Sequence, residues 1–192
     1  MFDFADNADV QRITAAIYEA GGVVGAVCHG PAALVGVEIA GGRKLLQGRR
    51  VAGFTNEEEL YLIPNARDIF PFLLEDRLRA DGADFVGGPL FLEHTIADGR
   101  VVTGQNPWST WSVAEGMIRA LGHEPVVRPR SREELAVDLL ITYHREGRHA
   151  ASEVLNRGVN ADRRLLLMHA FISATRGQWR DAFNIHALAH DD

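Results

Sequence analysis

The short segment around Cys28 constrains the fold of this chain more than any other. The apolar run Val23–Val27 predicts a short buried strand, and Pro31 suits the first position of a helix, where its missing N–H costs nothing. The chain must therefore pass from strand to helix within three residues. Such a sharp turn needs small residues two positions before and after its centre, and Ala26 and Gly30 occupy those positions.

Cys28 lies at the centre of this turn and is the only cysteine of the chain. The pattern is that of a nucleophile elbow with sulfur in place of a serine hydroxyl. The N–H groups and positive dipole end of the following helix would stabilise a thiolate, so we expect a pKa below the ordinary thiol value of about 8.5. The alternative is a buried structural thiol, the usual state of a free cysteine.

Four segments resemble one known superfamily. The elbow sequence Ala26–Ala32 resembles that of the DJ-1/PfpI superfamily, in particular its heat-shock-protein-31-like, glyoxalase III branch. The order and spacing of the segments match from Met1 to about His123, and nothing after Pro125 matches. The other three segments are Phe2–Asn7, Val51–Glu59 and Asp98–Pro107.

The resemblance implies an α/β fold of the flavodoxin-like, class I glutamine amidotransferase-like type. This chain opens where family members have already formed their first strands, so we expect a parallel sheet that lacks them. In the family those first strands also carry a glutamate near the nucleophile and a glycine loop that donates one oxyanion N–H, so we expect this chain to lack both. We expect residues 1–125 to form the family-like domain. The proline-containing stretch Pro125–Arg130 suits a linker, and residues 131–192 predict an all-α extension.

The pattern of residues supports this architecture. Helices alternate with short apolar strands up to residue 125, which favours a mainly parallel sheet. We expect a helix from Pro31 to about Ile39, a hairpin turn at Asp98-Gly99, and a final helix over Pro107–Leu121 capped by Asn106. The capping role accounts fully for Asn106. Beyond residue 131 only helical spacing remains, and it predicts three or four helices.

The resemblance also implies a catalytic set of Cys28, His29 and Glu59. His29 would serve as the base, and Glu59 would accept from the imidazole and fix its tautomer. Glu57 and Glu58 lie close enough to leave the choice of acid open. Three successive glutamates more often form a solvated helix start, and the alternative for His29 is a residue that only packs or caps the helix.

Bulk properties exclude several classes of protein. A net charge of −6 in 192 residues argues against nucleic acid as the main partner. One cysteine excludes an internal disulfide framework, and the N-terminus has no signal-peptide pattern. No apolar run is long enough to span a membrane. These features lead us to expect a cytoplasmic protein without a cofactor. We also expect no metal site, since the remaining histidines have no recognisable ligand spacing.

We therefore expect a cofactor-independent, cysteine-dependent enzyme that acts on small reactive carbonyl compounds. The resemblance implies a glyoxalase III-like lyase that converts methylglyoxal to a hydroxy acid. Two alternatives stay open: a non-catalytic redox-responsive or holdase-chaperone-like module, and a cysteine hydrolase or amidotransferase-like domain. The absent strands leave the edge of Val23–Val27 unpaired, which favours a homo-oligomer.

Overall fold

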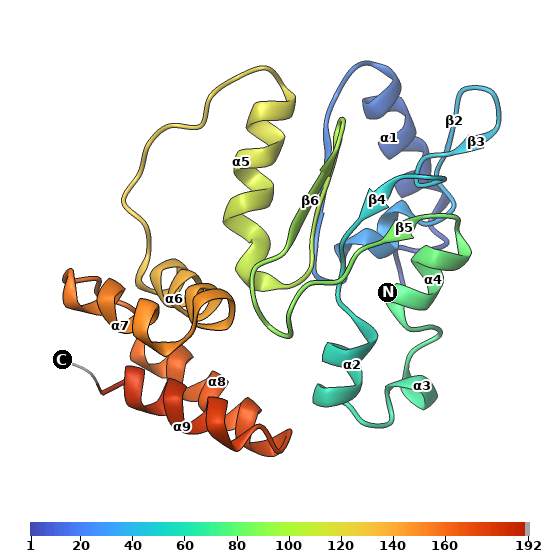
Figure 1. Ribbon diagram of the computed structural model, residues 1–192. Helices are drawn as coiled ribbons and strands as arrows, with labels where there is room; N and C mark the ends of the chain where they lie inside the picture. The colour runs from blue at the N-terminus through green and yellow to red at the C-terminus, as the bar shows by residue number, and fades with distance from the viewer. Residues whose placement is uncertain (191–192) are drawn as a thin grey trace. The chain divides into compact units, whose positions relative to one another are not determined.

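The computed structural model describes residues 1–190, and it divides into two compact units, Met1–Val126 and Val127–Asp192. Figure 1 shows strands and helices in the first unit and helices in the second. The predicted α/β class with an all-α C-terminal region is confirmed. That residues 1–125 form the family-like domain and residues 131–192 a helical extension stays a prediction.

The main sheet of the first unit has the strand order β1-β7-β6. β1 (Val24–Val27) is parallel to β7 (Val101–Gly104), and β7 is antiparallel to β6 (Thr95–Asp98). The turn between β6 and β7 contains Gly99, whose φ of 59° lies in the left-handed region that glycine adopts without strain. The predicted hairpin turn at Asp98-Gly99 is therefore confirmed, and it joins strands at Thr95–Asp98 and Val101–Gly104.

Two short strand pairs complete the unit. β4 (Arg50–Val51) is parallel to β5 (Asp84–Phe85), and β2 (Glu38–Ile39) is antiparallel to β3 (Arg43–Lys44). The chain after β4 passes close to the main sheet, where the Ala52 N–H donates to Thr103 Oγ1 at 2.8 Å. This contact brings the segment that leads to Glu59 beside the carboxyl end of β7.

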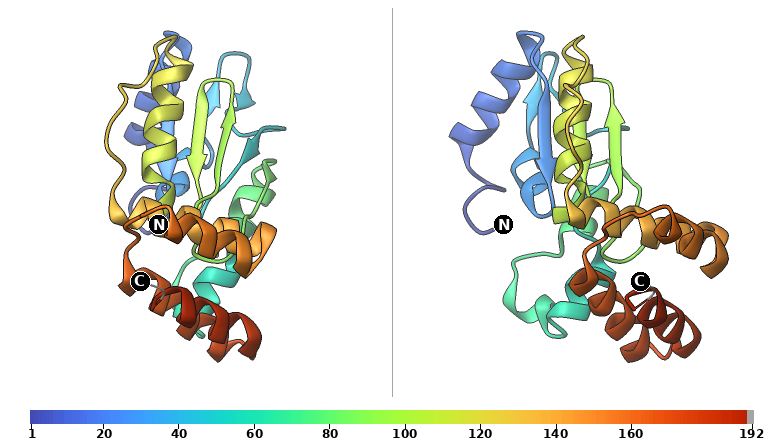
Figure 2. Two further views of the ribbon diagram at one scale, coloured as in Figure 1. Left: turned by 60° about the vertical axis from the view of Figure 1, so that its left-hand side comes forward. Right: turned by 90° about the vertical axis from the view of Figure 1, so that its left-hand side faces the viewer.

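Helices α1 (Ala8–Glu19) and α5 (Thr110–Ala120) lie on the same side of the β6–β7 hairpin in the left view of Figure 2. α5 approaches the sheet closely, because a Cβ atom on Gly25 would lie 2.2 Å from Met117 Sδ. The remaining helices of the unit are α2 (Asn56–Leu62), α3 (Ala66–Ile69) and α4 (Leu74–Ala80).

The helix predicted over Pro31–Ile39 is wrong. The chain forms only a short 3-10 helix, η1 (Gly30–Leu34), and then extends into β2. Val35 and Val37 are fully buried in the core, and Gly36 between them has a φ of 69°. Burial of these two β-branched side chains around a left-handed glycine stabilises the extended path over helix propagation. The predicted final helix likewise begins as a 3-10 turn, η2 (Pro107–Ser109), before α5.

The second unit consists of α6 (Arg132–Glu146), α7 (Arg148–Asn156), α8 (Arg163–Thr175) and α9 (Trp179–Leu188). Ser131 and Glu134 form a capping box at the start of α6, which locates that end of the helix. The core is aliphatic, and its most buried members include Leu139, Leu140, Leu166, Ile185 and Leu188.

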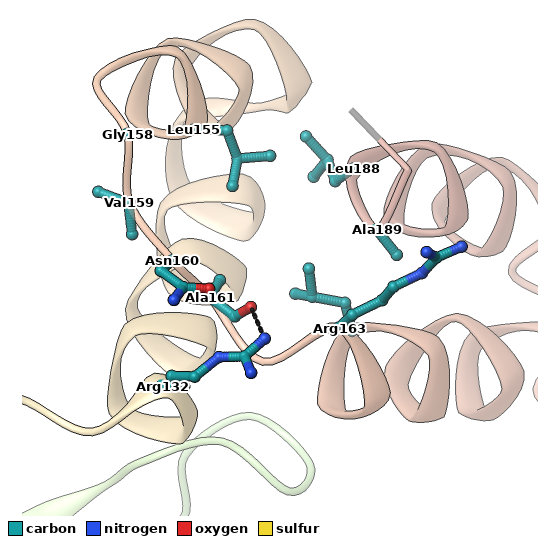
Figure 3. A pocket seen from close by; sticks show the side chains of 10 residues that line it. Arg132, Leu155, Gly158, Val159, Asn160, Ala161, Arg163, Leu188 and Ala189 are labelled. Atoms are coloured by element: carbon teal, nitrogen blue, oxygen red, sulfur yellow. Dashed lines mark hydrogen bonds between the residues drawn. The ribbon is translucent and has the colours of Figure 1, made fainter. Parts of the chain in front are cut away.

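An open pocket of about 340 Å³ lies within the second unit (Figure 3). Leu155 and Leu188 supply apolar walls, and Arg132 and Arg163 lie at its margin. The guanidinium of Arg132 donates to the Ala161 carbonyl at 3.4 Å, as the dashed line shows. Within residues 1–190, no helix is long and apolar enough to cross a membrane.

Candidate active site

Cys28 follows β1 directly and adopts a left-handed backbone with φ of 62°, a conformation that costs a non-glycine residue free energy. Two backbone hydrogen bonds hold it there. The Cys28 N–H donates to the Gly104 carbonyl at 2.9 Å, and the Phe54 N–H donates to the Cys28 carbonyl at 3.0 Å. The sharp turn predicted at this position is present. Strain of this kind is typical of functional sites, where surrounding structure over-determines the backbone.

A continuous chain of contacts joins Cys28, His29 and Glu59. Cys28 Sγ lies 3.4 Å from His29 Nδ1, and His29 Nε2 lies 2.5 Å from Glu59 Oε2. A carboxylate only accepts, so Nε2 carries the ring proton and Nδ1 presents its lone pair to the thiol. The structure thus brings together all three residues expected from the sequence, in an order that allows a proton to pass from sulfur to imidazole.

Aromatic rings fix the plane of His29. Its ring centroid lies 4.6 Å from that of Phe54 and 6.4 Å from that of Phe70. The His29 side chain is 34% exposed, whereas that of Glu59 is 4% exposed. The imidazole therefore has one side open to solvent and one side bound to a buried carboxylate, which suits a base that must meet both a thiol and a substrate.

The pKa expected for Cys28 is wrong in direction. Burial, and to a smaller extent the negative charges of Glu58 and Glu59, raise the pKa of the Cys28 thiol to about 11. The His29 backbone N–H lowers it, but by less than burial raises it. The expected stabilisation depends on a helix that extends from Pro31 to about Ile39 behind the thiol. η1 spans only Gly30–Leu34, and its short macrodipole cannot offset the burial of a charge.

The three successive glutamates have different surroundings. Glu57 is exposed, as expected of a helix start, but Glu58 and Glu59 are almost completely buried. Glu59 faces His29, and Glu58 accepts from several groups on another side of α2. The three residues thus split between a solvated helix start and buried contacts.

Two residues of the site were not identified by sequence reasoning. Asn106 Oδ1 accepts from the Trp108 N–H, as expected of a cap, but its Nδ2 also donates to Glu58 at 2.9 Å. Gln105 Nε2 donates to the same carboxylate at 3.0 Å. Both side chains are fully buried. Their position directly after an apolar strand was the available signal, because functional side chains often follow the carboxyl ends of parallel strands.

Within the described residues 1–190, no group of three or more histidine, cysteine, aspartate or glutamate side chains is arranged to hold a metal ion. Cys28, His29 and Glu59 form a linear contact chain rather than a convergent set of ligands.

Comparison with curated proteins finds relatives over about 63% of this chain. The chain is 40% identical over 128 residues to the glutathione-independent glyoxalase HSP31 of Saccharomyces cerevisiae, and 35% identical over 127 residues to glyoxalase 3 of Candida albicans. It spans about half the length of these relatives, 53% and 52% respectively. No family model matches the chain.

Solved structures give the same result. The rapid encystment protein of Francisella tularensis matches with a TM-score of 0.59 and 34% identity, covering 62% of this chain and 52% of that one. Glyoxalase III from Candida albicans matches with a TM-score of 0.58 and 33% identity, again covering 62% and 52%. The resemblance to the glyoxalase III branch of the DJ-1/PfpI superfamily, inferred from the sequence, is confirmed for this part of the chain.

Proposed function

We propose that the first unit carries a cofactor-independent, cysteine-dependent site for small reactive carbonyl compounds, with glyoxalase III-like lyase activity on methylglyoxal. The observation that carries the proposal is the contact chain from Cys28 through His29 to Glu59. The names of its relatives support the same chemistry, since those proteins are described as glutathione-independent glyoxalases. Cys28 is the nucleophile, His29 the base, and Glu59 the group that orients the base.

Because the pKa of Cys28 is about 11, the resting site holds a thiol rather than a thiolate at neutral pH. The nucleophile must therefore form during attack. As sulfur bonds to the aldehyde carbon, its proton moves to His29 Nδ1, and the imidazolium is stabilised by Glu59. His29 then delivers that proton to the aldehyde oxygen, which leaves a hemithioacetal and the neutral imidazole.

The second half of the reaction moves a proton between the two substrate carbons. A base removes the C–H proton of the former aldehyde carbon, and the resulting enediol is protonated at the neighbouring carbon to give a thioester. Water then breaks the thioester, releases the hydroxy acid and restores the thiol, so the net change is addition of one water. The His29 N–H at the elbow is suited to bind the oxygen that carries charge in these steps.

Methylglyoxal consumption by the purified chain tests this proposal. Cys28→Ala should abolish turnover, His29→Ala should nearly abolish it, and Glu59→Ala should leave a measurable residue. A nucleophile is indispensable, whereas the orienting acid is less so. Glu57→Gln is the matched control, because this exposed side chain lies on the same helix. Absence of turnover by the unmodified chain, or turnover that survives Cys28→Ala, would overturn the proposal.

The alternatives have less support. A redox-responsive role requires a thiolate at neutral pH, and the raised pKa of Cys28 opposes it. No described contact favours a holdase-like module or a hydrolase or amidotransferase-like domain over the glyoxalase chemistry. The absence of a cofactor and the cytoplasmic location stay predictions.

A further inference from the structure

Glu58 has contacts that the reaction outlined above does not explain. Its side chain is completely buried, yet it carries a carboxyl group, and isolated charges are very costly to bury. Here the cost is offset by five donors. Oε2 accepts from the Thr55 N–H and Oγ1, both at 3.1 Å. Oε1 accepts from the Phe91 N–H at 2.8 Å, Gln105 Nε2 at 3.0 Å and Asn106 Nδ2 at 2.9 Å.

These donors come from three separate segments. Thr55 caps the N-terminus of α2, Phe91 lies in the loop before β6, and Gln105 and Asn106 follow β7. Phe91 has a φ of 51°, so its backbone is held in a left-handed conformation where its N–H reaches Glu58. Polar networks that are fully satisfied in this way make a buried region rigid and specify one arrangement.

Two of these segments also hold the backbone of Cys28. The Gly104 carbonyl that accepts from Cys28 directly precedes Gln105, and the Phe54 N–H that donates to Cys28 directly precedes Thr55. Glu58 therefore binds Thr55 and Gln105, and each of these residues directly follows one of the two residues that support the Cys28 backbone. It is also the chain neighbour of Glu59, on a helix of only seven residues whose own hydrogen bonds could not hold it in place.

We propose that Glu58 is a positioning residue, which fixes α2 against the ends of β1 and β7 so that Glu59 meets His29 at hydrogen-bond distance. This proposal deepens the proposed function and rests on it. Glu58 touches neither the thiol nor the imidazole by any described hydrogen bond, so its effect on the position of His29 is exerted through Glu59; its negative charge separately raises the pKa of Cys28. Its partners are all donors, and only a group that accepts on both oxygens satisfies them.

The substitution Glu58→Gln tests this, because it keeps the shape but turns one acceptor into an NH₂ group that must face donors. Glu57→Gln is the control, since it removes the same charge from the exposed neighbour on the same helix. The main readout is the tautomer of His29 at pH 8, from ¹⁵N chemical shifts of the imidazole, assigned by comparison with His29→Ala. This measurement does not depend on turnover.

We expect one tautomer, protonated at Nε2, in the unmodified chain and in Glu57→Gln. Glu59→Gln and Glu58→Gln should both give a mixture, and the double variant should be no more mixed than Glu59→Gln alone. If the chain turns over methylglyoxal, kcat should fall about 10- to 100-fold in Glu58→Gln, the range expected when a catalytic group is misplaced by an ångström or less. Effects on kcat should likewise not add in the double variant.

A folded Glu58→Gln variant with a single His29 tautomer would overturn the proposal. If that variant does not fold, Gln105→Met decides, because it removes one donor to Glu58 at similar volume. It should shift His29 in the same direction by a smaller fraction, and an unchanged tautomer would count against us. If the unmodified chain shows no turnover while these shifts occur, the glyoxalase proposal fails and the positioning role of Glu58 stands.

Discussion

The thiol of Cys28 shows how position and environment compete within one residue. Its backbone has the left-handed geometry of an elbow, which exposes the sulfur to a base. Its surroundings are poor in positive charge, and two buried carboxyl groups lie near it. The consequence is a thiol that must lose its proton to His29 when a substrate arrives, rather than one that waits as a thiolate.

This leads to a pH-dependent prediction. The rate of alkylation of Cys28 by iodoacetamide should rise about tenfold per pH unit through neutral pH and level off near the pKa of about 11. Between about pH 9 and 11 the unfolded thiol loses its proton while the folded one keeps it. The free energy of unfolding should therefore fall as pH rises through that window. Below it this residue contributes no pH dependence.

Cys28→Ala is the control for the second effect, because it should remove the fall in stability that this residue causes between pH 9 and 11. Stability is measured by urea unfolding at each pH, and alkylation by mass spectrometry. An alkylation midpoint at or below 8.5 would show that the thiolate is stabilised in the folded chain and that burial does not dominate.

At the scale of elements, the close packing of η2 and α5 against Gly104, the last residue of β7, fixes the position of the elbow. A Cβ atom on Gly104 would lie 2.5 Å from Ser109 Cβ and 2.8 Å from a methyl of Val113. The side chains of Ser109 and Val113 are short and rigid. They can move away from a new Cβ atom only if the backbone of η2 and α5 moves with them. Because the Gly104 carbonyl accepts from the Cys28 N–H, any shift here reaches the nucleophile.

We therefore expect Gly104→Ala to destabilise the fold by about 1–3 kcal/mol, the usual cost of overpacking, and to slow any reaction of Cys28. Gly30→Ala is the matched control at the other side of the elbow. A Cβ atom there would lie 3.5 Å from Ala26 Cβ, an ordinary contact, so stability should change little. Urea unfolding compares the two variants, and equal stabilities would contradict the close approach seen here.

Elements with local signals were predictable, and those decided by burial were not. The turn at Gly99 and the cap at Asn106 follow from residue type, so both were identified from sequence. The path after Pro31 was mistaken for helix because only the packed core shows that Val35 and Val37 are buried. Similarly, the sequence placed Glu59 near His29 through family resemblance. It could not distinguish the environment of Glu58, because three of its five donors come from Phe91, Gln105 and Asn106, more than 30 residues away.

At the scale of the whole molecule, the edge of the main sheet is the outstanding feature. Within residues 1–190, β1 pairs with β7 on one side and has no strand on the other. The N–H groups of Val24 and Cys28 donate toward β7, to the carbonyls of Arg100 and Gly104. In a parallel ladder alternate residues face opposite sides, so the N–H groups of Gly25 and Val27 face away from β7.

Self-association, which the sequence also led us to expect, would cover that edge. The prediction is that light scattering gives a mass above that of one 21.1 kDa chain, and that the Gly25 and Val27 amides exchange slowly with solvent. Dilution should lower the mass and speed exchange at these two residues while Val24 and Cys28 stay protected. A monomer with all four amides equally protected would show that the edge is covered in another way.

The parallel pairing of β1 with β7 also determines when the site can form during synthesis. Cys28, His29 and Glu59 leave the ribosome before their supports at Gly104 and Asn106, which emerge more than 40 residues after Glu59. Until then β1, which directly precedes Cys28, lacks its partner strand β7, and the carboxyl of Glu58 lacks its donors Gln105 and Asn106. A nascent chain thus carries its cysteine without the arrangement that gives it chemistry, and acquires that arrangement only when the last strand of the sheet is added.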